Sequence, residues 1–208
     1  MQLLTEDGTV EERATIFVVD DDPGVSRAMN SVGQLLDLPV ASFLSANEFL
    51  ASYDSSQPGC LVLDIKMPGM TGLELQQRLI DDGMPLPIIM ISGNADVRIA
   101  VEAMSRGAVT LLEKPCRLDE LTTHIRRAID IDSESRRSLH HRAQTESKLA
   151  SLTAKEREVL DLVASGKTNK EIAKTLKLST RAVEDRRSRL MKKLGARSVV
   201  ELIQLNAI

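Results

Sequence analysis

The sequence predicts an α/β domain with a doubly wound, five-stranded parallel sheet, followed by an all-α domain of four short helices. Over residues 1–122, short apolar runs alternate with segments of helical periodicity, which is typical of a parallel α/β fold. Beyond residue 122 only helical periodicity continues. The charge also changes sign along the chain. Residues 1–123 hold 19 acidic and 8 basic residues, a net charge of −11, whereas residues 124–208 hold 11 and 19, a net charge of +8.

Five apolar runs are expected to form the strands. Runs of this length, bounded by turn-forming residues, fit strands that are buried on both faces of a sheet. They cover residues 16–19, 40–43, 60–63, 87–92 and 109–112. Helices are expected from Pro23 onward, around Phe49 and Leu50, over residues 73–79 and over about 95–105. We therefore expect a first domain over residues 1–122.

Residues 123–150 are expected to form a linker. The segment is mostly polar after Ile131, so a disordered linker and a long solvated helix both fit its composition. No Gly or Pro follows Pro115 before Gly166, and this lack of helix breakers favours a helix. A second domain is expected over residues 151–208, with helices at about 153–164, 169–176, 180–194 and 198–206.

Polar and charged side chains lie at or just after the ends of four of the expected strands. Asp20 and Asp21 follow the first strand, Asp64 follows the third and Lys114 the fifth, and Ser92 is the last residue of the fourth. In a sheet of order 2-1-3-4-5 these ends meet at one edge. Carboxylates gathered there repel one another and need a cation, and oxygen ligands suit Mg²⁺. Such a site is equipped to transfer a phosphoryl group to a carboxylate. The alternative, ordinary solvated residues at strand ends, would require four separate coincidences.

The first domain resembles the receiver domain of two-component response regulators. The matching segments are residues 18–22 (VVDDD), 63–72 (LDIKMPGMTG), 91–93 (ISG) and 113–115 (EKP). The resemblance implies a flavodoxin-like fold. It also implies that Asp64 is the phosphoacceptor and that Ser92 and Lys114 contact the phosphoryl group. By the same resemblance, Mg²⁺ would be held by Asp20, Asp21, Asp64 and the backbone carbonyl of Lys66.

Further details of the site are implied by this resemblance. The peptide bond between Lys114 and Pro115 would be cis, as in the family. The chain departs from the family at Leu111 and Cys116, where an aromatic residue is common. Leu111 has no polar tip, so we expect the signal to leave through the loop after Ser92 and the helix that follows it.

The face of that helix, residues 95–105, bears on dimerisation. Its apolar residues fall on more than one side. Val97, Ala100, Val101 and Met104 are spaced as a core stripe, which would leave Ile99 and Ala103 on a flank. We expect this flank, with the fifth strand, to form the dimer face of the phosphorylated protein.

The second domain carries a helix-turn-helix pattern. Two of its expected helices meet at a short turn, and the second is strongly basic. Its core is expected to contain Ile172, Ala173, Leu176, Val183, Leu190 and Leu194. The residues expected to suit DNA phosphates are Arg186, Arg187, Arg189, Lys192 and Lys193. A basic solvated face is the alternative for a run of charges alone.

Nearly all of this domain resembles the LuxR/NarL-type output domain, and the order of domains is that of FixJ-like regulators. The resemblance implies contacts with double-stranded DNA. The residues that it assigns to DNA are Thr168, Asn169, Lys170, Thr180, Arg181, Glu184, Asp185, Arg187, Ser188 and Lys192. Among these, Asp185 is unusual because an acidic side chain repels phosphate.

Together these features predict a transcription factor. A sensor histidine kinase would phosphorylate Asp64, after which the protein would dimerise, bind promoter DNA and activate transcription with RNA polymerase. The resemblance extends to regulators of aromatic (styrene) catabolism. Two alternatives stay open: a regulator that works unphosphorylated, and a metal-dependent aspartyl phosphohydrolase. The phosphohydrolases usually have a second Asp where this chain has Lys66, which argues against that alternative.

The sequence also bears on the location of the protein. No apolar run approaches the roughly 20 residues of a membrane span. Cys60 and Cys116 are expected at opposite ends of the sheet, too far apart for a disulfide. We therefore expect a cytoplasmic protein that does not enter the membrane.

Overall fold

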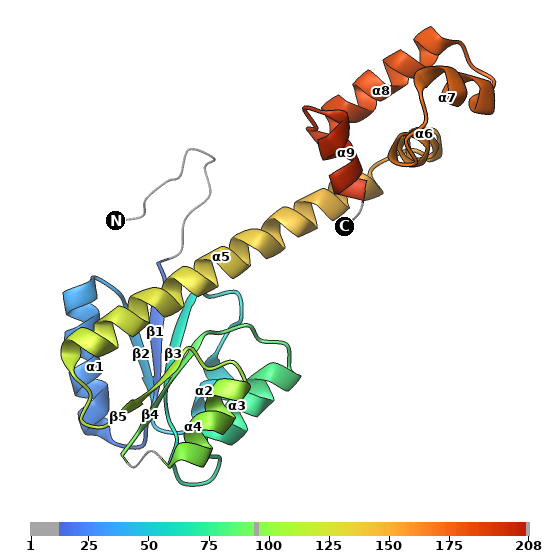
Figure 1. Cartoon of the computed structure of the whole chain (residues 1–208). Helices are drawn as coiled ribbons and strands as arrows, with labels where there is room; N and C mark the ends of the chain where they lie inside the picture. Colours follow the sequence, from blue (N-terminus) through green and yellow to red (C-terminus); the bar gives the residue numbers. More distant parts are fainter. Residues whose placement is uncertain (1–12, 94–95, 207–208) are drawn as a thin grey trace. The chain divides into compact units, whose positions relative to one another are not determined.

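The computed structural model describes residues 13–93 and 96–206, and the first of its two folded units has the expected five-stranded sheet (Figure 1). All of the strands are parallel, in the order β2-β1-β3-β4-β5, which confirms the predicted topology. Their bounds are β1 (Thr15–Val19), β2 (Val40–Phe43), β3 (Gly59–Asp64), β4 (Ile88–Ser92) and β5 (Thr110–Glu113).

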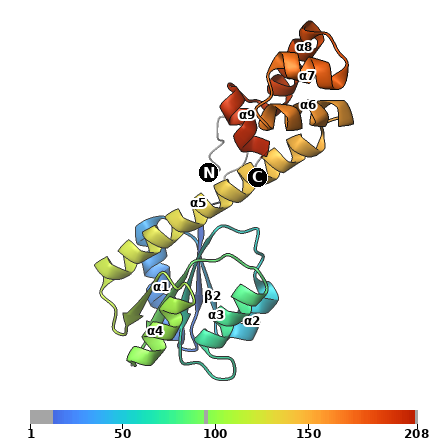
Figure 2. The ribbon, with the colours of Figure 1, turned by 45° about the vertical axis from the view of Figure 1, so that its right-hand side comes forward.

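Helices cover both faces of this sheet, as the two rotated views show (Figures 1 and 2). Their bounds are α1 (Pro23–Leu36), α2 (Ala46–Ser52), α3 (Gly72–Asp81), α4 (Val97–Ser105) and α5 (Leu118–Ala150). One face is covered by α1 and the first part of α5, and the other by α2, α3 and α4. The expected start of the fourth helix, at residue 95, lies outside the described residues.

Successive side chains along the central strands point alternately into two separate hydrophobic cores. In β1, Ile16 and Val18 point into the core under α1 and α5, whereas Phe17 and Val19 point into the core under α2, α3 and α4. All four side chains are buried. A strand with apolar residues at every position is therefore consistent with burial on both faces.

Side chains at the helix starts fix where two of these helices begin. The Asp22 carboxylate accepts a hydrogen bond from the Gly24 N–H at 2.7 Å, and Pro23 follows as the first residue of α1. Thr71 and Glu74 form a capping box at the start of α3. Both helices therefore start within the loops that carry the predicted site residues.

The orientation of α4 differs from the predicted one. Val97 and Val101 are 76% and 62% exposed, whereas Ala103 is fully buried and Ile99 packs against the core. The predicted core stripe thus faces solvent, and the predicted dimer flank faces the sheet. A small side chain at Ala103 allows close approach to α3, where Gln76 Nε2 donates to the Ala103 carbonyl oxygen at 3.0 Å.

The second folded unit is entirely helical. Its helices are α6 (Ala154–Ala164), α7 (Asn169–Leu176), α8 (Thr180–Leu194) and α9 (Val199–Asn206), close to the expected bounds. The six residues predicted for its core all belong to one apolar cluster, which Val159, Leu160, Val163 and Leu202 complete.

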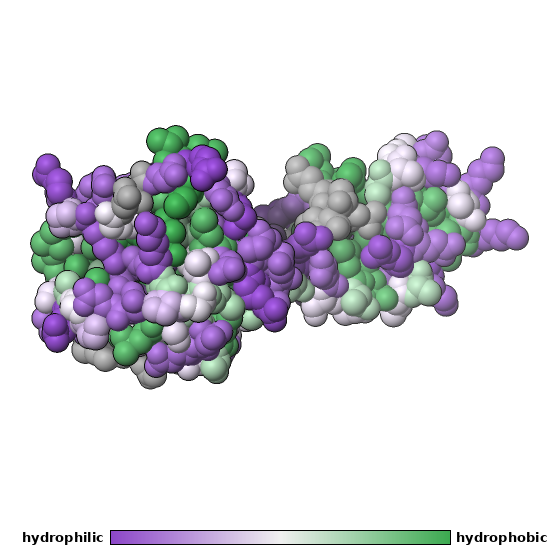
Figure 3. Space-filling view, turned by 90° about the horizontal axis from the view of Figure 1, so that it is seen from below, coloured by the Kyte–Doolittle hydropathy of each residue, from purple (hydrophilic) through white to green (hydrophobic). Residues whose placement is uncertain are grey.

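The two compact units comprise residues up to Ser135 and from Arg136 onward. The first unit thus extends past residue 122, because Ile125 and Ala128 of α5 are fully buried in its core. Hydrophilic side chains cover much of the surface seen in Figure 3, with groups of hydrophobic side chains between them. No helix in the described part of the chain is long and apolar enough to span a membrane.

Candidate phosphoacceptor site and nucleic-acid interface

Asp20, Asp64 and Lys114 meet at the carboxyl edge of the sheet. The Lys114 Nζ atom lies 2.6 Å from Asp20 Oδ2 and 2.6 Å from Asp64 Oδ1. These residues follow β1, end β3 and follow β5, so the parallel sheet brings together residues that lie 94 positions apart. Both carboxylates are almost fully buried, at 2% and 5% exposure.

Backbone N–H groups hold both carboxylates in place. Lys66 N donates to Asp64 Oδ2 at 2.6 Å, and Asp22 N donates to Asp20 Oδ1 at 3.0 Å. Each carboxylate therefore accepts one hydrogen bond from its own loop and one from Lys114. Such charge-assisted hydrogen bonds are stronger than neutral ones and fix the orientation of each carboxylate.

The electrostatics of the site leave an excess of negative charge. Burial of the Lys114 ammonium lowers its pKa, but the hydrogen bonds and charges of Asp20 and Asp64 outweigh burial and hold the pKa above its ordinary value of 10.5. Lys114 thus stays protonated and offsets one carboxylate. With Asp21, which is exposed beside Asp20, two negative charges remain, a balance that suits a divalent cation.

The expected metal ligands only partly converge. Within the described residues, no three His, Cys, Asp or Glu side chains form a set that could hold a metal ion as they lie. Asp20 and Asp64 instead share the ammonium of Lys114. Oxygen ligands from these two side chains, from Asp21 and from the Lys66 carbonyl have the chemistry that Mg²⁺ prefers.

Gly72 belongs to the candidate site for a steric reason that the sequence analysis did not identify. A Cβ atom at this position would lie 2.2 Å from the backbone oxygen of Asp64. Gly72 N also donates to the Ile65 carbonyl oxygen at 3.0 Å. The first turn of α3 therefore packs directly on the backbone that carries the candidate phosphoacceptor, and only glycine fits there.

The remaining predicted residues lie around this site. Ser92 is buried at the end of β4, and its carbonyl oxygen accepts from Lys114 N at 2.8 Å. The peptide bond between Lys114 and Pro115 is cis, as the resemblance implied. Leu111 packs partly buried against the core, and Cys116 is half-buried with a free thiol.

Most residues predicted for DNA contact are exposed on one helix-turn-helix. Ser179 caps α8, accepting from Ala182 N at 3.2 Å, and Lys177 ends α7 in the left-handed conformation. The exposed candidates are Thr168, Lys170, Thr180, Arg181, Glu184, Asp185, Ser188 and Lys192. Asn169 and Arg187 are half-buried, and the Arg187 guanidinium donates to Asn169 Oδ1. This contact joins the start of α7 to α8.

Lys193 is already engaged within its own unit. Its Nζ atom donates to the Ser151 carbonyl oxygen at 2.8 Å and to Glu156 Oε2 at 3.0 Å. Hydrogen bonds from Thr153 and Lys193 lower the pKa of Glu156 to about 2. Lys192 and Lys193 are both exposed, but Lys193 already makes these two contacts, so we expect Lys192 to be the more available of the two for a DNA phosphate.

Comparison with protein families agrees with both units. Residues 16–126 match the family described as the response regulator receiver domain. Residues 150–206 match the family described as bacterial regulatory proteins, luxR family.

Individual relatives match nearly the whole chain. TdiR, a transcriptional regulatory protein of Thauera aromatica, is 36% identical over 190 residues, which is 91% of this chain and 84% of the relative. FixJ, a transcriptional regulatory protein of Bradyrhizobium diazoefficiens, is 36% identical over 190 residues, 91% and 93% of the two chains. Among solved structures, the response regulator StyR is similar with a TM-score of 0.85 at 35% identity, over 94% of this chain and 98% of that one.

Proposed function

Because this chain belongs to the response regulators that join a receiver domain to a LuxR-type DNA-binding domain, we propose that phosphorylation of Asp64 controls its binding to promoter DNA. Its relatives are transcriptional regulators, which sets the phosphohydrolase alternative aside. A kinase and DNA are the partners that this pair of domains implies. The observation that carries the proposal is the buried Asp64 carboxylate, held 2.6 Å from the ammonium of Lys114.

The chemistry proposed for Asp64 is a direct phosphoryl transfer. The Asp64 oxygen attacks the phosphorus of a phosphohistidine on a sensor kinase. The new P–O bond forms as the P–N bond breaks, and the imidazole nitrogen keeps the electron pair and takes a proton. Lys114 stabilises the charge on the phosphoryl oxygens, and the backbone N–H of Lys66 orients the carboxylate. We assign to the Ser92 hydroxyl the binding of the phosphoryl group after transfer.

Magnesium is the cofactor we propose for this step. Asp20, Asp21, Asp64 and the Lys66 carbonyl oxygen would hold it, and when bound it would neutralise charge on the phosphoryl oxygens. The excess of two negative charges at the site supports this assignment. Replacement of Asp21 by Ala should weaken Mg²⁺ binding, and a metal titration followed by NMR would measure the loss.

Acetyl phosphate labelling tests the phosphoacceptor. The full chain should take up one phosphoryl group in the presence of Mg²⁺, and Asp64→Asn should take up none, because the amide is not a nucleophile. Circular dichroism should show that this variant still folds. If Asp64→Asn is labelled as fast as the natural chain, the assignment is wrong.

Dimerisation on phosphorylation is the next element of the proposal. The exposed valines of α4, Val97 and Val101, form the surface that we assign to it, in place of the flank predicted from sequence. Large contiguous apolar patches on a protein surface often mark interaction sites. Two DNA-binding domains joined in one dimer would gain affinity from effective concentration.

The phosphorylated dimer is proposed to regulate transcription. The dimer would bind operator DNA in the cytoplasm, recruit RNA polymerase and activate an operon of aromatic (styrene) catabolism, as the resemblance suggests. Footprints with and without acetyl phosphate would distinguish this from regulation by the unphosphorylated chain. Identical footprints in both states would favour the unphosphorylated alternative.

A further inference from the structure

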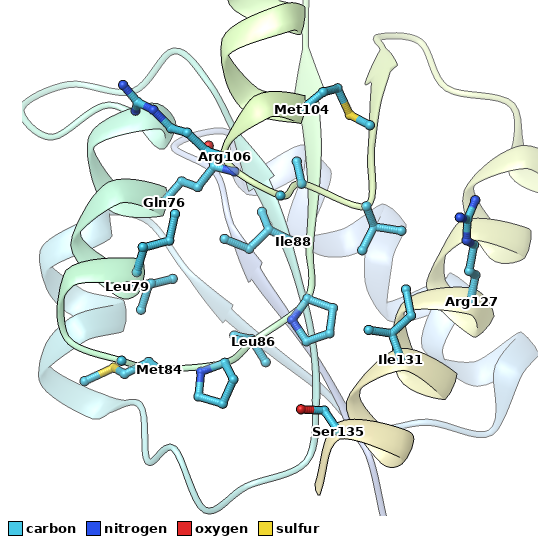
Figure 4. A pocket seen from close by; sticks show the side chains of 17 residues that line it. Gln76, Leu79, Met84, Leu86, Ile88, Met104, Arg106, Arg127, Ile131 and Ser135 are labelled. Atoms are coloured by element: carbon cyan, nitrogen blue, oxygen red, sulfur yellow. The ribbon is translucent and has the colours of Figure 1, made fainter. Parts of the chain in front are cut away.

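A hollow opens in the first unit at the end of the sheet opposite to Asp64. Its floor includes Ile88, the first residue of β4, and its walls come from α3 with the following loop, from the end of α4, and from α5 (Figure 4). Its volume is about 670 Å³. Small-molecule sites in proteins commonly enclose about 300–1,000 Å³. The size is thus that of a ligand site, distinct from the phosphoacceptor site.

The walls of this hollow leave apolar side chains uncovered. Ile80 on α3, Met104 on α4 and Ile131 on α5 are 48%, 46% and 42% exposed. Each of them comes from a different helix. Met84 and Met104 add flexible thioether side chains that adapt to an irregular ligand. Exposed apolar side chains from three helices line the hollow, which favours a ligand with an apolar part.

Within residues 13–93 and 96–206, the walls hold one exposed guanidinium without a partner and one buried acceptor atom without a donor. Arg127 lies beside Ile131 on α5, and across residues 13–93 and 96–206 its guanidinium has neither an ion pair nor a hydrogen bond. The Gln76 side chain is 1% exposed, and its Oε1 atom is buried without a hydrogen-bond partner in the described chain.

The other guanidinium at the hollow is already occupied. Arg106 donates to the Leu73 carbonyl oxygen at 3.1 Å and forms an ion pair with Glu102. Among the described residues that line the hollow, Arg127 is thus the guanidinium without a partner, and a single positive charge beside an apolar surface suits a monoanion better than a phosphate dianion. A carboxylate also matches the planar fork of a guanidinium.

From these contacts we infer that the hollow binds a small amphipathic carboxylate. Its apolar body lies against Ile80, Met104 and Ile131, and its carboxylate pairs with Arg127. Residues of α3, α4 and α5 border the hollow, and its volume of about 670 Å³ suits a compact molecule. The site is independent of Asp64 and does not rest on the phosphorylation proposed above.

An NMR titration of the full chain with 4-phenylbutyrate tests this inference. Amide signals of residues around the hollow should shift in a saturable way, while those around Asp64 stay unchanged. The neutral 4-phenylbutan-1-ol should bind about tenfold more weakly, because it lacks the charge that pairs with Arg127. Arg127→Ala should weaken binding of the carboxylate by a similar factor and leave binding of the alcohol unaltered.

Arg126 provides the matched control. It is the preceding residue, it is exposed, and it does not line the hollow. Arg126→Ala should therefore bind 4-phenylbutyrate as the natural chain does, and Ile131→Glu should abolish binding of both compounds. All variants should still accept phosphate from acetyl phosphate, which shows that the receiver fold is intact.

Three results would overturn the inference. The first is the absence of saturable shifts at millimolar 4-phenylbutyrate. The second is equal weakening by Arg126→Ala and Arg127→Ala, which would indicate unspecific charge attraction. The third is a shift of the same signals when the protein concentration alone is raised, which would make the hollow a contact between copies of this chain.

Discussion

The carboxylate of Asp132 accepts a hydrogen bond from the backbone N–H of Gly59 at 2.9 Å, although the two residues lie 73 positions apart. Gly59 begins β3, the strand that ends at Asp64, and Asp132 lies on α5. The Asp132 side chain is 1% exposed. One buried carboxylate thus ties the helix that continues toward the second unit to the central strand of the receiver domain.

Removal of that carboxylate should destabilise the receiver domain. Asp132→Ala leaves the buried N–H of Gly59 without its acceptor, at a cost of about 1–3 kcal/mol. Urea unfolding followed by circular dichroism measures the loss. Asp132→Asn keeps an acceptor oxygen of similar shape and should lose less. Equal losses in the two variants would show that the hydrogen bond to Gly59 contributes little.

A methyl group at Gly72 should impair phosphorylation without removing any reacting group. Because the added Cβ would meet the Asp64 carbonyl oxygen at 2.2 Å, Gly72→Ala must displace the loop that carries the nucleophile. A misplacement of about 1 Å can slow a positioned reaction by roughly 100-fold. The rate of labelling by acetyl phosphate is the measurement.

Gly69 offers the control for that experiment. It lies in the same loop with φ at 77°, and nothing lies within 4 Å of a Cβ placed there, so Gly69→Ala strains the turn without striking Asp64. If Gly69→Ala slows labelling as much as Gly72→Ala does, loop strain rather than the contact with Asp64 is responsible.

Two neighbouring lysines of α8 should behave differently in DNA binding. Lys192 is exposed, so Lys192→Ala should reduce the slope of log K against log[salt] by about 0.9, as should Lys170→Ala at the start of α7. Lys193 is held by Ser151 and Glu156, so Lys193→Ala should lower the melting temperature and leave the slope nearly unchanged. Fluorescence anisotropy at several salt concentrations measures the slope. A reversed pattern would contradict this placement of the two side chains.

The two cysteines should differ in reactivity. Burial, and to a lesser extent the charge of Asp132, raises the pKa of Cys60 from 9.0 to about 12, whereas Cys116 is half-buried. In the native chain at pH 8, a thiol reagent should modify Cys116 and spare Cys60 until the protein is unfolded. Mass spectrometry distinguishes the two sites, and modification of native Cys60 would disprove its burial.

The same pKa shift makes stability depend on pH in the alkaline range. Because the folded state raises the pKa of the Cys60 thiol, its contribution to stability is fully present below pH 9 and is lost as the pH rises toward 12. Urea unfolding at pH 8 and pH 10.5 should show a smaller decline for Cys60→Ala than for the natural chain. An equal decline would assign the pH dependence to other groups.

The exposed valines of α4 should control dimerisation. Val101→Glu places a charge at the proposed interface, so the phosphorylated variant should remain monomeric in sedimentation velocity. It should still be labelled at Asp64, because Val101 is 62% exposed and contributes little to the core. Ile99→Lys should instead destabilise the domain, since Ile99 packs against the core. Normal dimerisation of phosphorylated Val101→Glu would exclude this surface.

The sequence by itself determined the sheet, its strand order and most of the site. Apolar runs at β1 and β3 have one stable environment, buried on both faces, and the polar residues after them must then share one edge. Asp20, Asp64 and Lys114 therefore come together for reasons that are local to each strand. The helices of the second unit were predictable because their apolar residues recur with helical spacing within each segment.

The tertiary structure alone decided which face of α4 is buried, because that helix has apolar residues on more than one side and only the packing of Ala103 against α3 selects between them. It also decided that Lys193 is engaged, since its partner Glu156 belongs to another helix. The contact of Asp132 with Gly59 likewise joins distant segments. Side-chain periodicity describes one element at a time, whereas these features depend on distances between elements.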